Sequence, residues 1–281
     1  AGGLPESLTG FLPWSAKLLL RLASAKPKKG VTILEQWCTA IPIGTAVAQS
    51  FDPEFARDLG DIVGKEMEIF NVDLWLAPAL NIHRSVLCGR NFEYFSEDPL
   101  VSGVMAAAIT KGVQSHAGKG TTVKHYAANN QETNRYASNS IVSERALREI
   151  YLKGFEMAVK EAHPFSIMTS YNKINGVWGH YHYDLVATIL RGEWGYQGNV
   201  ITDWWMQEGA SPEFPNIRND AYRIRAQVDV LMPGGKNFFD KSMKPDGTLL
   251  ASYGKEDGIT LGELQETAKN VLRCVMELKK R

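Results

Sequence analysis

Short apolar, β-prone runs alternate with longer stretches of helical periodicity along most of the chain. The strand pattern falls at residues 74–78, 121–126, 166–171, 199–204 and 228–232. The helical pattern falls at residues 52–70, 99–114, 143–161, 184–194, 218–226 and 261–280. Apolar strands that alternate regularly with helices indicate parallel strands joined by helical crossovers.

This alternation predicts an α/β fold, and a TIM-like (β/α) barrel is the architecture that it favours. No Gly-x-Gly-x-x-Gly motif follows any of the five strands, so the main signature of a dinucleotide-binding fold is missing. Five strands fall short of the eight of a complete barrel, and we therefore expect an incomplete one. The stretch 240–258, rich in Gly, Lys and Asp, reads as a surface excursion.

Polar side chains gather where the predicted strands end. Arg90 lies in the loop after the first strand, Lys124 and His125 end the second, Tyr171 ends the third and Asp203 ends the fourth. Catalytic residues of barrel enzymes lie at the carboxyl ends of the strands. We therefore expect these side chains to converge on one mouth of the sheet.

Simpler interpretations exist for each of these residues. Asp203 also fits a helix cap, although the bulky pair Trp204-Trp205 that follows is unusual for one. Arg90 also fits a surface ion pair. Lys124, at the end of an apolar strand, should be partly buried and then needs an anionic partner or a ligand.

The composition narrows the classes of partner. Lys and Arg together number 31, as do Asp and Glu, and this balance argues against a nucleic-acid-binding protein and suits a neutral substrate. His180 and His182 have no third ligand at matching spacing, so we expect neither a metal nor a cofactor. Cys38, Cys88 and Cys274 are odd in number and far apart, which favours reduced thiols in a cytoplasmic protein.

Residues 1–38 read as an extension or insertion that precedes the main domain. Residues 8–25 are apolar-rich, but Pro13, Lys17 and Arg21 interrupt them, so an amphipathic surface helix is favoured over a membrane span. The chain begins at Ala1 without an initiator Met, and we interpret this start as cut.

Five motifs, in this order, strongly resemble glycoside hydrolase family 3, the β-glucosidase family. They are NIHR (81–84), CGRNFEYFSEDP (88–99), KHYAANNQE (124–132), SERALREIY (143–151) and TDW (202–204). The likeness runs from about Thr39 to the end of the chain, and residues 39–281 are expected to form the barrel domain of this family.

The resemblance implies that Asp203 is the catalytic nucleophile. It implies substrate-binding roles for Arg90, Lys124, His125, Met168, Tyr171 and Trp204. The first three would bind the glycone hydroxyls, Tyr171 would be the tyrosine beside the nucleophile, and Met168 and Trp204 would form part of the pocket wall. A retaining glycosidase needs such a carboxylate below the anomeric carbon. Nearby Lys124 and Arg90 are expected to lower its pKa. Glu93 is a candidate partner for one of these cations.

The chain departs from the family pattern in two places. The family carries a sugar-binding Asp in a Ser-Asp-Gly-Pro motif upstream of the segment that matches from Thr39 onward, and this motif is absent here. The chain is therefore expected to start just after the first barrel strand. The family's general acid/base is usually a Glu on an α/β sandwich domain, which is expected as a partner outside residues 39–281. Glu208 and Glu132 are the acids inside the chain that offer a substitute.

The expected function is that of a retaining β-glycosidase, of β-glucosidase type. It would hydrolyse terminal non-reducing β-D-glycosides through a covalent glycosyl–Asp203 intermediate. One alternative is an inactive, carbohydrate-binding barrel, because two expected site residues lie outside the chain. The other is a Schiff-base lyase that uses Lys124.

Overall fold

A parallel β-sheet with helices packed along it forms the framework of the protein. The computed structural model describes residues 37–206, 209, 219–233 and 247–279. Residues 37–40 are irregular and belong to a separate unit, so the fold below is that of the chain from Ile41 onward. The described strands of the sheet are β1 (Leu74–Trp75), β2 (Gly120–Tyr126), β4 (Ser166–Thr169), β7 (Asn199–Trp204) and β8 (Val230–Met232).

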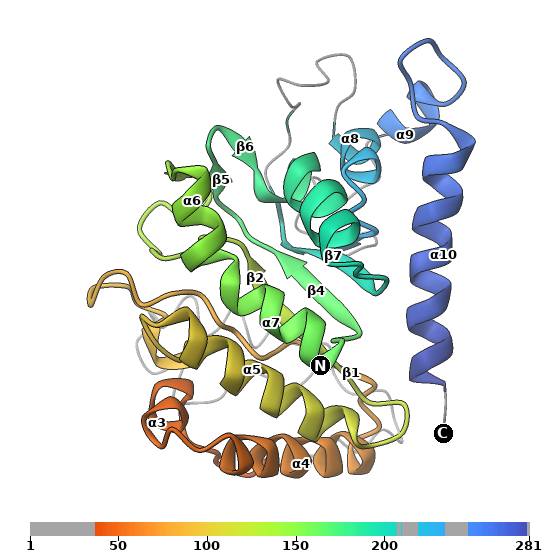
Figure 1. Cartoon of the computed structure of the whole chain (residues 1–281). Coiled ribbons are helices and arrows are strands. Elements are labelled where there is room, and N and C mark those ends of the chain that lie inside the picture. Colours follow the sequence, from red (N-terminus) through yellow and green to blue (C-terminus); the bar gives the residue numbers. More distant parts are fainter. Residues whose placement is uncertain (1–36, 207–208, 210–218, 234–246, 280–281) are drawn as a thin grey trace, which may run out of the picture. The chain divides into compact units, whose positions relative to one another are not determined.

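These strands pair in the order β1-β2-β4-β7-β8, so each lies beside the next one along the chain (Figure 1). All pairings between them are parallel. The five strands are those that the sequence predicted. Sequential parallel strands joined by helical crossovers make the sheet an incomplete (β/α) barrel, as expected.

The inner strands β2 and β4 are buried on both faces, whereas the residues of the outer strands β1 and β8 are only partly buried. Every residue of β4 is buried, and so are six of the seven residues of β2. Tyr126 pairs with Thr169 and Trp204 pairs with Met232, so the carboxyl ends of neighbouring strands meet at one edge of the sheet. That edge carries the polar residues singled out above.

Helices α4 (Pro53–Ile69) and α5 (Pro99–Gln114) begin with the same device, an Asp cap followed by Pro. The Asp52 carboxylate accepts hydrogen bonds from the backbone N–H groups of Glu54 and Phe55 at 2.9 and 3.1 Å. Asp98 accepts one from Leu100 at 2.7 Å. Pro has no N–H to leave unsatisfied in the first turn, which is why the pair marks a helix start so clearly.

Helices α4 and α5 pack backbone to backbone through two glycines. A Cβ atom on Gly112 would lie 2.1 Å from the carbonyl oxygen of Arg57, and one on Gly60 would lie 2.3 Å from that of Ile109. Neither space admits a side chain. This close approach fixes the helix pair, and α5 in turn packs against β2 and α7.

The helix predicted at 143–161 is interrupted. It consists of α6 (Glu144–Ala146), the π-helical turn η2 (Leu147–Tyr151) and α7 (Lys153–Ala162). The predicted helix 184–194 is the π-helical segment η4 (Asp184–Glu193). The other helices among the described residues are α3 (Gly44–Gln49), η1 (Asn91–Glu93), η3 (Gly179–Tyr181), α8 (Asn219–Arg225), α9 (Thr248–Ser252) and α10 (Leu261–Leu278).

Helix α9 lies within the stretch 240–258 that was read as a surface excursion, and none of its residues is buried, so its described part agrees with a surface position. One feature differs from the expectation. A second, three-stranded sheet of β3 (Asn139–Ser140), β5 (Lys173–Ile174) and β6 (Val177–Trp178) was not predicted, since two-residue strands are too short to show a pattern. The amphipathic helix expected at 8–25 lies outside the described residues. In the part of the chain that is described, no helix is both long and apolar enough to cross a membrane.

Helix α10 is tied to the sheet through Asp229, whose side chain is buried. Its Oδ2 atom accepts from Arg191 at 2.7 Å and from the backbone N–H of Val200 at 2.8 Å, and its Oδ1 atom accepts from Asn270 of α10 at 3.1 Å. Burial raises the pKa of Asp229, and Arg191 opposes that rise. One carboxylate thus joins η4, β7 and α10.

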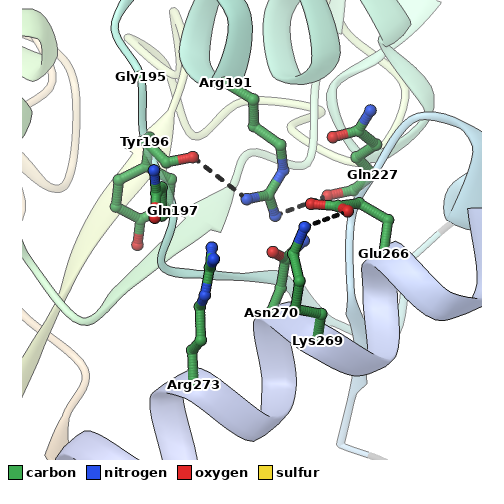
Figure 2. Close-up of a pocket in the computed structure, with 9 residues that line it drawn as sticks. All are labelled: Arg191, Gly195, Tyr196, Gln197, Gln227, Glu266, Lys269, Asn270 and Arg273. Carbon is green, nitrogen blue, oxygen red and sulfur yellow. Dashed lines mark hydrogen bonds and ion pairs between the residues drawn. The ribbon is translucent and has the colours of Figure 1, made fainter.

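A cavity of about 300 Å³ lies beside this junction. Figure 2 shows Arg191 reaching from η4 toward α10, where Lys269 pairs with Glu266. Arg191 is held by Asp229 and by the backbone carbonyls of Gly198 and Gln227. The loop that lines the cavity precedes β7, so the cavity lies at the amino-terminal edge of the sheet, away from the polar strand ends.

Substitution of Gly112 by Ala should lower the free energy of unfolding by about 1–3 kcal/mol, because the added methyl group forces α4 and α5 apart. Gly262→Ala on α10 is the matched control, since its Cβ would meet only Thr260 Oγ1 at 3.9 Å. We expect the control to change stability by less than about 0.5 kcal/mol. Denaturant unfolding of the two variants measures the difference, and equal stabilities would contradict the close packing.

Candidate active site

Asp203 lies at the carboxyl end of β7, with 8% of the residue exposed. The backbone N–H of Trp204 donates to its Oδ1 atom at 2.7 Å, and the Tyr171 hydroxyl also donates to the carboxylate. The Nε2 atom of His125 lies 3.7 Å from Oδ2. A carboxylate held in this way is fixed in orientation, with its charge largely removed from water.

Burial raises the pKa of Asp203 above its ordinary value of 3.8. The N–H of Trp204, the hydroxyl of Tyr171 and the cations Arg90 and Lys124 all act in the opposite direction. The expectation that the two cations would leave this pKa lowered was therefore wrong in its net direction. They stabilise the charged form, but the loss of hydration outweighs them.

Two glutamates lie between the cations of the site. Glu93 forms a short ion pair with Arg90, and its Oε2 atom lies 3.8 Å from Nζ of Lys124. This confirms Glu93 as the expected anionic partner. Glu132 accepts from Arg135 at 2.6 Å and lies 3.9 Å from Arg90. Each glutamate therefore positions two cations, and each links the loop after β1 to residues of β2 or the loop after β2.

Burial lowers the pKa of Lys124, with Glu93 opposing the change. The same burial lowers the pKa of His125 well below 6.5, and the positive charges of Arg90, Lys124 and Arg135 add to the effect. His125 is only 1% exposed. Its imidazole is therefore neutral at physiological pH.

Arg135 is a site residue that the sequence analysis missed. Its guanidinium lies 4.8 Å from the centre of the Tyr171 ring, and Tyr171 also packs on Tyr136 with ring centres 4.5 Å apart. Arg135 belongs to the loop between β2 and β3. The sequence analysis considered polar residues at the ends of the predicted strands and therefore did not include it. A cation that stacks on the Tyr171 face restricts the orientation of this ring.

A pocket of about 330 Å³ opens at this edge of the sheet. Its walls hold all seven residues that the sequence singled out, together with two others. The lining residues are Leu76, Arg90, Lys124, His125, Arg135, Met168, Tyr171, Asp203 and Trp204. Sequence positions more than 100 residues apart thus converge on one mouth, while the individual roles of the residues stay predictions.

The pocket presents three cations, one carboxylate, one neutral imidazole, one phenol and one indole. Glu93 and Glu132 hold the cations without forming part of this lining. Such a lining offers many hydrogen-bond donors, one carboxylate and an aromatic wall. It suits a compact ligand that is rich in hydroxyl oxygens.

Other residues considered from the sequence have structural contacts. His83 Nε2 lies 2.9 Å from the carbonyl oxygen of Asn91, and His116 lies between Asp61 and Glu68. No group of three His, Cys, Asp or Glu side chains that could hold a metal ion occurs among the described residues. Glu208 lies outside these residues.

Comparisons with known proteins agree on one family. The family described as "Glycosyl hydrolase family 3 N terminal domain" matches residues 18–244. A β-glucosidase of Ruminococcus albus is 45% identical over 238 residues, which are 84% of this chain and 24% of that protein. The β-glucosidase structure from Paenibacillus barengoltzii matches with a TM-score of 0.79 at 46% identity, covering 86% of this chain and 26% of that one.

The structure of β-glucosidase 3B from Thermotoga neapolitana in complex with glucose matches with a TM-score of 0.74 at 38% identity. That match covers 90% of this chain and 34% of the other. The chain therefore belongs to glycosyl hydrolase family 3 and contains its N-terminal domain. It spans about a quarter to a third of the length of these relatives.

Replacement of Glu93 by Gln should weaken glucose binding by roughly tenfold, because Gln neither neutralises nor holds Arg90 and Lys124. Glu97→Gln is the control, since Glu97 is exposed and makes no ion pair with the described residues. Titration calorimetry with glucose measures both variants. An unchanged affinity in Glu93→Gln would show that the cations need no partner there.

Proposed function

We propose that this chain supplies the sugar pocket and the nucleophile of a retaining β-glycosidase of β-glucosidase type. Its substrates would be terminal non-reducing β-D-glycosides, either β-glucosides or short oligosaccharides. The observation that carries the proposal is the position of Asp203. This buried carboxylate lies at a strand end and faces a pocket in which Arg90, Lys124 and Tyr171 surround it with donors.

In this mechanism a carboxylate oxygen of Asp203 attacks the anomeric carbon as the bond to the leaving oxygen breaks. The product of the first step is a glycosyl ester of Asp203, and water then hydrolyses it. Arg90, Lys124 and His125 would bind the sugar hydroxyls, while Met168 and Trp204 form the wall. The pKa of Tyr171 is raised by burial and by the Asp203 charge, so its hydroxyl keeps its proton and donates to the carboxylate.

The proton for the leaving group requires a second acid, which we assign to an α/β sandwich domain outside residues 39–281. Glu132 is engaged by Arg135 and is a poor candidate for this role. The relatives support the substrate class, since the structures from Thermotoga neapolitana and Kluyveromyces marxianus contain glucose. We also propose a cytoplasmic location, which three unpaired thiols favour.

An activated 2-fluoro glucoside with a dinitrophenolate leaving group should label the chain on Asp203. Such a leaving group needs no acid, and the fluorine slows hydrolysis of the ester. Intact mass followed by peptide mapping detects the adduct, and Asp203→Asn should show none. Sugar binding with no adduct, even after the sandwich domain and the upstream segment are restored, would instead favour an inactive, carbohydrate-binding barrel.

The labelling rate should fall as the pH drops through the raised pKa of Asp203, because only the ionised carboxylate attacks. The acidic limb of the second-order labelling rate, measured well below saturation so that it reports the ligand-free chain, should therefore lie above pH 3.8, the ordinary value for Asp. Lys124→Met removes a cation that opposes the rise, so its limb should move to still higher pH. If the labelling rate of Lys124→Met fell at the same pH as that of the unaltered chain, the Lys124 charge would have no effect on the pKa of Asp203.

A further inference from the structure

The side chain of Asn81, which is 2% exposed, is bonded to His125 at three points. Its Nδ2 donates to the His125 carbonyl oxygen at 2.8 Å, and its Oδ1 accepts from the His125 backbone N–H at 3.0 Å. These two bonds fix the orientation of the Asn81 amide. If it were flipped, its NH₂ group would face the backbone N–H of His125 and its oxygen would face the carbonyl oxygen of His125. The third contact joins the same Oδ1 to the Nδ1 atom of the His125 ring at 3.1 Å.

This third contact determines where the ring proton lies. An amide oxygen can only accept, so Nδ1 must carry the hydrogen of this bond. The imidazole is neutral in its buried position beside three cations. Its other nitrogen, Nε2, is therefore left without a proton and with a free lone pair.

Nε2 is also the ring nitrogen nearest the nucleophile. It lies 3.7 Å from Asp203 Oδ2, too far for a hydrogen bond, and it makes none with the rest of the described chain. Neither atom has a hydrogen to give to the other. The pocket therefore holds two neighbouring acceptors, and its lining also includes the donors of Arg90 and Lys124.

We propose that Asn81 is a positioning residue that holds His125 in the neutral Nδ1–H form, so that Nε2 acts as an acceptor for one sugar hydroxyl. The binding of a sugar hydroxyl by Nε2 rests on the proposed function, whereas the position of the ring proton does not.

An acceptor at Nε2 would make the pocket selective among ligands. A group bound between Nε2 and the cations must donate in one direction and accept in the other, as a hydroxyl does and a fluorine or a methyl ether does not.

The arrangement also keeps His125 from competing with the sugar for Asp203. An Nε2–H group would point a donor at the carboxylate and occupy a lone pair needed for attack. With Nε2 bare, the sugar hydroxyl donates its hydrogen bond to His125, and the Asp203 carboxylate keeps the Trp204 N–H and the Tyr171 hydroxyl as its donors.

Nitrogen NMR of the chain labelled with ¹⁵N-histidine tests the ring state directly, because protonated and bare ring nitrogens differ widely in chemical shift. His125→Gln assigns the signals, and the other five histidines serve for assignment by elimination if that variant does not fold. We expect a protonated Nδ1 and a bare Nε2 from pH 6 to 8. A protonated Nε2 in the unaltered chain would overturn the proposal.

Asn81→Ala removes the acceptor, and we expect a mixture of the two neutral ring forms in this variant. Asn91→Ala, in the loop after β1, is the control and should leave the His125 signals unchanged. This measurement separates a positioning role from a purely structural one. If Asn81 were only structural, His125 in a folded Asn81→Ala variant would still carry its proton on Nδ1. An unmixed Nδ1–H form in a folded Asn81→Ala variant would contradict the positioning role.

Glucose and its monodeoxy and monodeoxyfluoro analogues test the sugar part. At one ring position both analogues should bind at least about tenfold more weakly than glucose, since neither can donate to Nε2. Fluoro analogues that bind like glucose at every position would mean that His125 donates, which would overturn the proposal. If glucose does not bind but Nδ1 carries the proton, the proposed function and the sugar part fail together and the role of Asn81 stands.

Discussion

A carboxylate that is withdrawn from water retains its charge only if the protein replaces the lost hydration. At Asp203 this replacement is partial. One backbone N–H, one phenol and two cations oppose the effect of burial, yet the pKa is still raised. The surrounding structure supplies these donors. The parallel strands bring them from distant parts of the sequence to one edge of the sheet, and Glu93 and Glu132 form ion pairs with the cationic ones.

Much of this framework could be predicted from the sequence because the signals involved are local. Helices α4 and α5 both begin with Asp-Pro, and the five parallel strands are apolar runs long enough to recognise. The convergence of the polar strand ends followed from the topology alone. The family motifs then pointed to Asp203 and to the residues around it, which the structure places in one pocket.

The features that were missed depend on contacts between distant residues. The net pKa of Asp203 is a balance between burial and four partners, and no sequence pattern reveals which side is larger. Arg135 joins the site through its stacking on Tyr171, from a loop that has no periodic signal. Asn81 stood inside a recognised motif, but its hold on His125 appears only once the two strand ends lie side by side.

The crossed arrangement of the ion pairs has a consequence for how this pocket can change over evolution. Glu93, from the loop after β1, pairs with Lys124 of β2, whereas Glu132, from the loop after β2, reaches back to Arg90. The pairs Arg90–Glu93 and Arg135–Glu132 each lie within one loop, whereas these two contacts cross between the segments. A graft of one loop from a relative would keep the pair inside each loop but replace one partner of both crossing contacts, so the two segments are expected to be inherited, exchanged and redesigned as a single module.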